Sequence, residues 1–459
     1  FRRLFAEGTF NAAFVPIYTS ELLTKKKNAQ NFASSVLNLL VLILLSLTIL
    51  VEIFMPYFIK LIAPGFEDIS NKYQLAVDLT RITFPFLFFI SLASFFSAIL
   101  NSHNKFAASA AAPLILNIIL ILCFIIVKKN DSNLVYYLSY SITLAGILQL
   151  LFLLIFVKKN FLNNFRFKFI IDNKIKFFFK KLLPSIFSSG VTQINILVGT
   201  IIASFQASAV SYLYYADRVY QINLAIAGIA IGTIILPNLS KYIKNNNKLK
   251  LSDLQNKSLE LSLFLSLPAT LALLIASEEI ISALFGYGSF NEESVKNSSI
   301  ALFYFSIGLP AFSMVKIFSS FIFANNDTKT PFYFSLISVA INIIISISLF
   351  NEVGFIIIPI ATTVSSYING FLLMVFVINK NYFAFNNKFF SQLFKILITN
   401  ILSMGIFYFL LSYFSELFLF SNNYKFLAII ILVIFTFTIY FLFSIFIKAF
   451  KISDIKLKY

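Results

Sequence analysis

Residues 106–127 read FAASAAAPLILNIILILCFIIV and carry no charged side chain. A helix rises about 1.5 Å per residue, so about 20 apolar residues cross the roughly 30 Å hydrocarbon core of a bilayer. This stretch is therefore long enough to span a membrane as a single helix.

The rest of the chain repeats this pattern. Of its 459 residues, 59% are hydrophobic and 12% are charged, and the mean hydropathy is +0.88. A soluble domain has about 45–50% apolar and about 25% charged residues, so the composition excludes a water-soluble enzyme and predicts an all-α polytopic membrane protein. Twelve stretches are long enough to cross a bilayer, at residues 33–55, 79–100, 106–127, 132–157, 182–205, 209–237, 259–277, 299–324, 331–350, 354–378, 391–414 and 426–447.

Helix breakers interrupt several of these stretches, among them Pro85, Gly228 and Gly232. Membrane helices tolerate such residues where neighbouring helices or water satisfy the freed backbone groups. We therefore expect partners for the backbone at these positions.

Residues 1–23 form a weaker, thirteenth candidate. If this segment crosses and ends at lysines 25–27, Phe1 lies outside the cell beside two arginines, and the chain begins with Phe rather than Met. We expect that a first helix, which starts in the cytoplasm, precedes Phe1 and is missing from this sequence.

Lysine and arginine residues in loops set the expected orientation. When alternate loops are assigned to opposite sides, one side holds 25 of these residues and the other holds 6. Cytoplasmic loops carry the excess of positive charge, so we expect the first set and the C-terminus to be cytoplasmic. The net charge of +17 then reflects membrane topology rather than nucleic-acid binding.

Few groups are available for covalent chemistry. The sequence has one cysteine, Cys123, and one histidine, His103, so neither a cysteine-based nor a His-rich metal site is expected. It contains no phosphate-binding loop and no dinucleotide fingerprint. We expect no enzyme activity, no cofactor and no metal.

The chain divides into lobes at a basic segment. Residues 158–181 carry eight cations among aromatic residues, which is typical of an amphipathic linker on the inner leaflet. The linker separates an N-terminal lobe (1–157) from a C-terminal lobe (182–378), a common transporter plan. Residues 379–459 add a helix hairpin and a cytoplasmic tail.

Asp217 and Arg218 are charged residues within an apolar stretch. A charge near the bilayer centre costs about 2.5–3.5 kcal/mol, so such residues usually line a cavity or pair with each other. One interpretation is a partly hydrated structural pair near the outer end of a helix. The other is that Arg218 points into a cavity and Asp217 orients it, which is favoured because neighbouring helix positions face directions about 100° apart.

Two further sets of charges lie at membrane depth. Arg3 and Glu7 are four residues apart and can meet on one helix face, which leaves Arg2 for another role; an anchor at the headgroups is the alternative. Lys316 lies inside the stretch 299–324, where its long side chain can also extend to the inner surface.

The sign of these charges indicates the class of ligand. With Arg81, which we expect to be an interfacial anchor, five basic residues stand against Glu7 and Asp217. A cavity of that sign favours an anion, and the planar guanidinium group suits bidentate phosphate contacts.

Five motifs follow one another along the chain: FRRLFAEGTFNAAFVPIY (1–18), APGF (63–66), FPFLFFISLASFFSAILN (84–101), YYADRVYQINLAIAGIAIGTIILPNLS (214–240) and DTKTP (327–331). In these motifs the sequence closely resembles the MurJ (MviN) lipid II flippases, a family of the multidrug/oligosaccharidyl-lipid/polysaccharide exporter superfamily.

The resemblance implies two six-helix lobes around a central cavity and a final helix pair, with about 13 of 14 spans present here. It implies transport of undecaprenyl-pyrophosphate-linked peptidoglycan precursor (lipid II) from the cytoplasmic to the periplasmic leaflet of the bacterial inner membrane, for cell-wall synthesis. Membrane lipids and cell-wall synthesis proteins are the other partners implied.

The resemblance also implies roles for particular residues. Arg2 and Arg218 match cavity arginines that engage the pyrophosphate, Ser211 would line the same cavity, and the hairpin 391–447 would offer a groove for the lipid tail. Gln221 stands where the family commonly has Glu, and residues 182–205 lack the acids of the sodium-coupled members. The candidate substrate-binding residues are Arg2, Arg3, Glu7, Ser211, Asp217 and Arg218, with Lys316 as a further candidate.

Two alternatives stay open. The same fold can export another lipid-linked oligosaccharide or a drug. A non-transporting membrane scaffold for cell-wall synthesis is the alternative from a different functional class.

Overall fold

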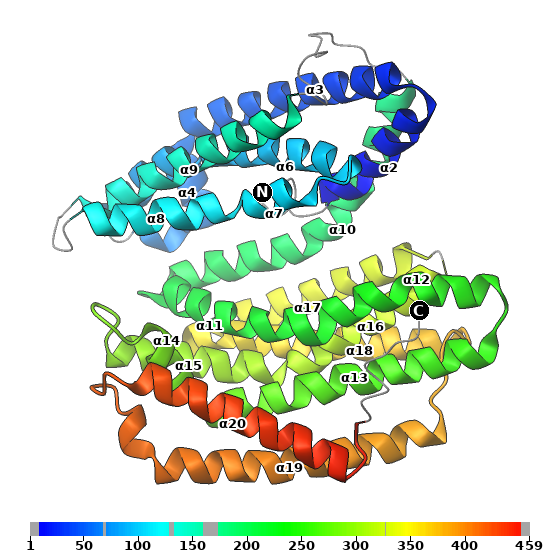
Figure 1. The fold of residues 1–459 in the computed structure, drawn as a ribbon. Coiled ribbons are helices and arrows are strands. Elements are labelled where there is room, and N and C mark those ends of the chain that lie inside the picture. The colour runs from blue at the N-terminus through cyan, green and yellow to red at the C-terminus, as the bar shows by residue number, and fades with distance from the viewer. Residues whose placement is uncertain (1–8, 68–69, 128–132, 159–172, 326, 451–459) are drawn as a thin grey trace. The chain divides into compact units, whose positions relative to one another are not determined.

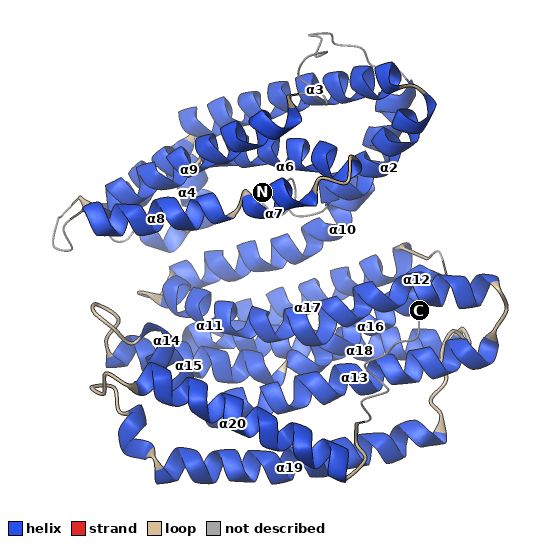
Figure 2. Cartoon of the chain, viewed as in Figure 1, coloured by secondary structure: helices blue, strands red, loops and turns tan. Residues whose placement is uncertain are grey.

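The computed structural model describes residues 9–67, 70–127, 133–158, 173–325 and 327–450. These residues form helices joined by short turns, and no strand occurs among them (Figure 2). The chain folds into two compact units, residues 1–197 and 198–459. Helix α10 (Asn173–Ser204) begins in the first unit and ends in the second (Figure 1).

The first unit is a bundle of helices that precede α10. Its elements are α2 (Thr9–Thr24), α3 (Lys26–Ile53), α4 (Met55–Ile62), the 3-10 turn η1 (Pro64–Phe66), α5 (Ser70–Thr83), α6 (Phe86–Ser102), α7 (Phe106–Ala111), α8 (Leu114–Ile126) and α9 (Leu134–Val157).

Aromatic rings form the centre of this unit. Phe14 on α2 is fully buried, and its ring centroid lies 5.6 Å from that of Phe32 on α3, 5.2 Å from Phe95 on α6 and 6.4 Å from Phe178 on α10. Each such ring pair adds about 0.5–1.5 kcal/mol beyond the burial of its area. One phenylalanine therefore ties four helices together.

The second unit contains the remaining helices. Its elements are α11 (Ala209–Leu224), the π-helical segment η3 (Ala225–Ala230), α12 (Ile231–Lys244), α13 (Lys248–Ile275), α14 (Ser277–Phe285), α15 (Glu292–Ile307), α16 (Leu309–Ala324), α17 (Lys329–Val353), η4 (Gly354–Ile356), α18 (Ile357–Asn379), α19 (Asn387–Tyr413), η5 (Ser415–Phe418) and α20 (Lys425–Phe446).

A π-helical segment interrupts the helical run from α11 to α12. The hydroxyl of Ser262, on α13, donates a hydrogen bond of 2.9 Å to the carbonyl of Ala227. Gly228 lies close to α16: a Cβ atom added to Gly228 would be 3.2 Å from the Cα atom of Ser313. The neighbouring helices thus supply the polar partner and the close packing that a break at membrane depth requires.

Helix α13 packs against α12, α15, α16 and α19, so it is central to the second unit. The last two helices, α19 and α20, pack against each other, and α20 also packs against α14 (Figure 1). The final helix pair expected from the sequence is therefore packed against the second unit through α13 and α14.

The described residues of all twelve predicted apolar stretches fall on helices or on the short turns between them, and residues 9–23 of the thirteenth candidate fall on α2. By length and composition, eight helical segments of the described chain are able to cross a membrane, or nine if the bent pair of α15 and α16 is one span. One of these segments, Lys329–Asn379, is 51 residues long and consists of the two packed helices α17 and α18. The number of spans and the upstream helix stay predictions, as do the lobe boundaries near residues 157, 181 and 378.

Candidate functional site

One side of α11 is left uncovered by the rest of the second unit. Ser211, Tyr214, Arg218 and Ile222 are exposed and recur at intervals of three or four residues, which places them on one helix face. The opposite side packs against α15 and buries residues such as Tyr220. We call these four exposed residues the α11 stripe.

Tyr220 fixes the rotation of α11. It is 4% exposed, and its ring centroid lies 5.6 Å from that of Phe305 on α15 and 5.4 Å from that of Phe312 on α16. Because this large side chain is packed between two helices, Arg218 two positions earlier is turned away from the core.

Arg218 lies well inside α11. The preceding turn contains Ser208, which has a left-handed backbone (φ 61°), and α11 begins at Ala209. Arg218 follows nine residues later, about 14 Å along the helix. The depth of this residue in a bilayer stays a prediction.

Tyr214 holds the guanidinium group in place. The Arg218 Cζ atom lies 4.6 Å from the centroid of the Tyr214 ring, one helical turn earlier. Within the described part of the chain, Arg218 takes part in no ion pair and no side-chain hydrogen bond. Its planar set of N–H donors is therefore available to a ligand. Tyr214 is not among the residues predicted from the sequence, although an aromatic residue four positions before an arginine is a usable signal.

Asp217 faces a different direction from Arg218. It is half-buried, and its Oδ2 accepts a hydrogen bond from the side-chain Nε2 of Gln221, one turn later. Gln221 is one of the positions at which the resemblance predicts a different residue, a glutamate. The amide thus supplies Asp217 with a donor from the same helix.

Lys316 is exposed on α16 but does not share a depth with Arg218. A Cβ on Gly232 would lie 3.5 Å from the Lys316 carbonyl oxygen, so these two residues are neighbours across α12 and α16. Arg218 is fourteen residues before Gly232 in the same helical run, which is about 20 Å along the axis. The structure therefore does not bring the two cations together.

Arg2, Arg3 and Glu7 lie outside the described residues. Their predicted role in a shared cavity with Arg218 therefore stays a prediction. Among the residues that the structure does describe, no group of three or more His, Cys, Asp or Glu side chains is placed to hold a metal ion.

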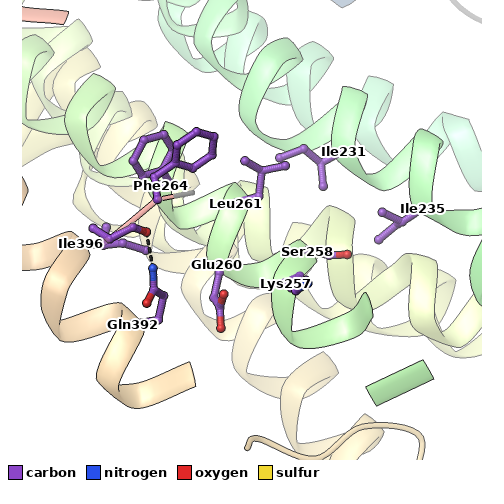
Figure 3. A pocket seen from close by; sticks show the side chains of 11 residues that line it. Ile231, Ile235, Lys257, Ser258, Glu260, Leu261, Phe264, Gln392 and Ile396 are labelled. Carbon is purple, nitrogen blue, oxygen red and sulfur yellow. Dashed lines mark hydrogen bonds between the residues drawn. The ribbon is translucent and has the colours of Figure 1, made fainter. Parts of the chain in front are cut away.

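A small apolar pocket of about 70 Å³ lies where α19 meets α12 and α13 (Figure 3). Ile231 and Ile235 come from α12, Phe264 from α13 and Ile396 from α19, and Gln392 Nε2 donates a hydrogen bond to the Ala449 carbonyl beside it. Helix α19 thus contributes Ile396 to this recess, together with Ala449 and Phe450, which follow α20. The groove for a lipid tail along residues 391–447 stays a prediction.

Comparison with known proteins gives the family. The family model described as lipid II flippase MurJ matches residues 1–448. The chain belongs to the MurJ family. A probable lipid II flippase MurJ of Rickettsia prowazekii (strain Madrid E) is 39% identical over 372 residues, which cover 80% of this chain and 73% of the relative. The corresponding MurJ of Rhizobium meliloti (strain 1021) is 40% identical over 379 residues, which cover 81% and 71%.

Solved structures agree with this assignment. A lipid II flippase MurJ in an inward closed conformation matches with a TM-score of 0.79 and 28% identity, over 97% of this chain and 89% of that one. An inward-facing MATE multidrug transporter matches with a TM-score of 0.69 and 13% identity, over 82% and 87%, and shares the fold alone. The predicted family, the helical transporter fold and the multi-pass membrane character are thereby confirmed.

Proposed function

We propose that this MurJ family member moves lipid II from the cytoplasmic to the periplasmic leaflet of the bacterial inner membrane by alternating access, with its C-terminus in the cytoplasm. The observation that carries the proposal is Arg218, which is exposed on the α11 stripe with its guanidinium group against the Tyr214 ring. The names of the relatives support lipid II as the substrate.

The α11 stripe suits the pyrophosphate of such a substrate. Moving a charged headgroup through hydrocarbon is costly, and placing a cation there costs about 2.5–3.5 kcal/mol by itself. Each cost falls when the arginine and the phosphate meet, because the guanidinium fork donates two parallel hydrogen bonds to phosphate oxygens. Translocation then needs no covalent step and no catalytic group.

Each candidate residue has a distinct proposed role. Arg218 binds the pyrophosphate, Ser211 offers a hydroxyl on the same stripe, and Asp217, whose carboxylate accepts a hydrogen bond from Gln221, helps to orient Arg218. Lys316 meets the anionic headgroup at a different depth, about 20 Å along the helix axis from Arg218. On the basis of their motif, Arg2, Arg3 and Glu7 are proposed to make a second group of contacts with the substrate.

The decisive experiment replaces the guanidinium group in the full-length protein. We expect Arg218→Ala to weaken substrate binding about ten- to hundredfold, because a hydrogen bond to a charged group is worth about 1.5–3 kcal/mol. The mutant should insert normally yet fail to support growth as the sole flippase in a depletion strain. Translocated precursor and membrane level of the protein are measured together.

Two variants complete this experiment. Arg218→Lys keeps the charge without the fork and should retain part of the activity. Ile222→Ala removes an exposed side chain from the same stripe without changing charge, and it should behave as the parent protein. Growth of the Arg218→Ala strain at parental rates would contradict the proposed phosphate contact.

The same strain separates the alternatives. A scaffold for cell-wall synthesis would tolerate Arg218→Ala, since its role does not need the cation. An exporter of another lipid-linked oligosaccharide or of a drug would fail to complement the depletion strain even as the parent protein.

A further inference from the structure

The turn between α12 and α13 is surrounded by positive charge. Four lysines lie on the two helix ends that meet there, and all four are exposed: Lys241, Lys244, Lys248 and Lys250. No aspartate or glutamate occurs from residue 240 to residue 252. The next acid in the sequence is Asp253, whose carboxylate lies 3.4 Å from the ammonium group of Lys257. The charge of the four lysines is therefore not neutralised by this hairpin.

A leucine lies among these lysines. Leu249 follows Lys248 and precedes Lys250 in the first turn of α13, and its side chain is 87% exposed. Burial of a leucine side chain is favourable, so a partner gains by covering it. We call Leu249 and the four lysines the basic tip.

The turn itself holds the basic tip in one conformation. Asn246 has a left-handed backbone (φ 51°), and the Asn247 N–H donates a hydrogen bond of 3.0 Å to the Tyr242 carbonyl, which closes the end of α12. The Asn247 side chain in turn accepts a hydrogen bond of 3.1 Å from the Lys250 N–H and caps α13. A partner therefore meets a surface that needs little ordering on binding.

The basic tip extends past its neighbours in the second unit. Gln255 Nε2 donates a hydrogen bond of 2.8 Å to the Tyr382 carbonyl, and Asn256 Nδ2 donates one of 3.1 Å to the Ala384 carbonyl. These bonds align residues 255 and 256 of α13 with the turn between α18 and α19. From Gln255, α13 continues seven residues back to Lys248, which is about 10 Å and brings the tip beyond that turn (Figure 1).

The apolar part of α13 predicts where the basic tip lies relative to a bilayer. Residues 258–275 carry one charged side chain, Glu260, and span about 27 Å, close to the roughly 30 Å of the hydrocarbon core. Lys248 lies ten residues before Ser258, or about 15 Å, whereas the headgroup layer adds only about 5–7 Å on each side. We therefore expect the tip to lie in water, beyond the lipid headgroups.

The first unit carries the same combination at one of its own turns. Leu23, at the turn between α2 and α3, is 85% exposed, and Lys25 and Lys27 beside it are exposed as well. A single exposed leucine needs no explanation, but a leucine among lysines at a helix turn of each unit favours a common role. The lysine count of the loops predicts that both turns are cytoplasmic.

We propose that the basic tip docks an acidic segment of a cytoplasmic protein, and that the turn at Leu23 is a second docking point of the same kind. Aspartate or glutamate side chains of the partner face the lysines, and one of its apolar side chains covers Leu249. Opposite charges speed the encounter and exclude other partners. The proposal rests on the cytoplasmic orientation proposed above and not on the role of Arg218.

A fluorescent reporter at the basic tip tests the proposal. The sequence contains no tryptophan, so Leu249→Trp introduces one into the protein in nanodiscs and keeps an apolar side chain. The probe is a synthetic peptide of Glu-Glu-Leu-Leu repeats. Its binding should shift the tryptophan emission to shorter wavelength and protect the ring from quenching by acrylamide, because the partner covers this position.

Charge and contact are separated by variants without the reporter, for which anisotropy of the labelled peptide gives the affinity. Lys248→Glu combined with Lys250→Glu should weaken binding about tenfold or more, because like charges then face each other. Leu249→Ser should weaken it about three- to tenfold through lost burial. Lys380→Glu combined with Lys388→Glu makes the same change in charge at exposed lysines beside the α18–α19 turn. This control should change binding less than twofold.

Three outcomes would overturn the proposal. One is absence of peptide binding by the parent protein, and another is an equal loss in the two double lysine variants, which would indicate attraction by net charge alone. The third is quenching of the Leu249→Trp fluorescence by brominated phosphatidylglycerol without peptide, which would place the tip on the membrane surface. Translocation by the purified Lys248→Glu, Lys250→Glu variant should stay at the parental level, so failure of this proposal and failure of the flippase proposal are distinguishable.

Discussion

Single residues determine what the α11 stripe offers to a ligand. Arg218 has a free set of donors because Tyr214 contacts its face rather than its N–H groups, the Arg218 Cζ atom being 4.6 Å from the ring centroid. Tyr220, buried between Phe305 and Phe312, turns the arginine away from the core. Binding chemistry on this helix thus depends on two tyrosines with different tasks.

The contribution of Tyr214 is measurable on its own. We expect Tyr214→Leu to lower translocation about two- to fivefold, because a cation–π contact at an exposed site is worth about 0.5–1 kcal/mol. Tyr214→Phe keeps the ring and should stay near the parental rate. A loss that is the same in both variants would point to the tyrosine hydroxyl and against the ring contact. The readout is translocated precursor at matched protein levels.

At the scale of elements, a helix that breaks in the membrane needs partners from its neighbours. The π-helical segment η3 at Ala225–Ala230 is accompanied by the Ser262 hydroxyl on the Ala227 carbonyl and by close contact of Gly228 with Ser313. The expectation that neighbouring helices supply partners for the backbone of this stretch is confirmed at Gly232, whose carbonyl accepts a hydrogen bond of 3.3 Å from the Ser320 hydroxyl on α16, and beside Gly228 at the Ala227 carbonyl. The π-helical segment lies between Arg218, on α11, and the part of α12 that neighbours Lys316.

Removal of the Ser262 hydroxyl tests this compensation. We expect Ser262→Ala to lower the free energy of unfolding by about 1 kcal/mol or somewhat more, since the Ala227 carbonyl loses a buried donor. Ser240→Ala is the matched control, because the Ser240 hydroxyl is exposed and bonds only within its own helix, to the Leu236 carbonyl. Thermal unfolding of the purified proteins gives the loss of stability in each variant. An equal loss in Ser262→Ala and Ser240→Ala would contradict the role of Ser262.

At the scale of the molecule, two compact units are joined by the long helix α10. Within the second unit, the final helix pair is held in part by Lys425, whose Nζ donates two hydrogen bonds of 2.7 Å, to the carbonyls of Gly286 and Phe420. Its ammonium group also lies 4.6 Å from the Tyr287 ring centroid and 4.3 Å from that of Phe420. Lys425 stands between the predicted stretches 391–414 and 426–447, where a loop lysine is expected, but the structure buries it at the first residue of α20. This lysine is a structural link between α20 and the α14–α15 turn.

Replacement of Lys425 should loosen that link. Lys425→Met keeps the length and the apolar stem but removes two charge-assisted hydrogen bonds, each worth about 1.5–3 kcal/mol. We expect a marked loss of thermal stability and faster hydrogen exchange in α20. Lys296→Met, an exposed lysine on α15, is the control and should change neither. Unaltered hydrogen exchange in α20 would show that the other contacts between α19 and α20 hold this helix in place without Lys425.

Residue patterns by themselves determined the fold class, the positions of the helices and the family. Long uncharged runs have few structural options in a bilayer, because every backbone polar group there must be satisfied within a helix. The motif around Tyr214 to Ser240 likewise located Arg218 as the principal candidate, because a charge among apolar residues is expensive and therefore conspicuous in a sequence.

Tertiary structure decided what the sequence pattern leaves open. Only packing shows that Arg218 is uncovered while Tyr220 is buried, that Lys316 lies at another depth, and that Lys425 bonds to carbonyls. It also leaves Leu249 uncovered at the start of α13, although leucine is a residue type that is most often buried. The physical reason is that a helix sequence gives the angle between its own side chains, whereas the neighbour that each face meets depends on contacts between residues far apart in the chain.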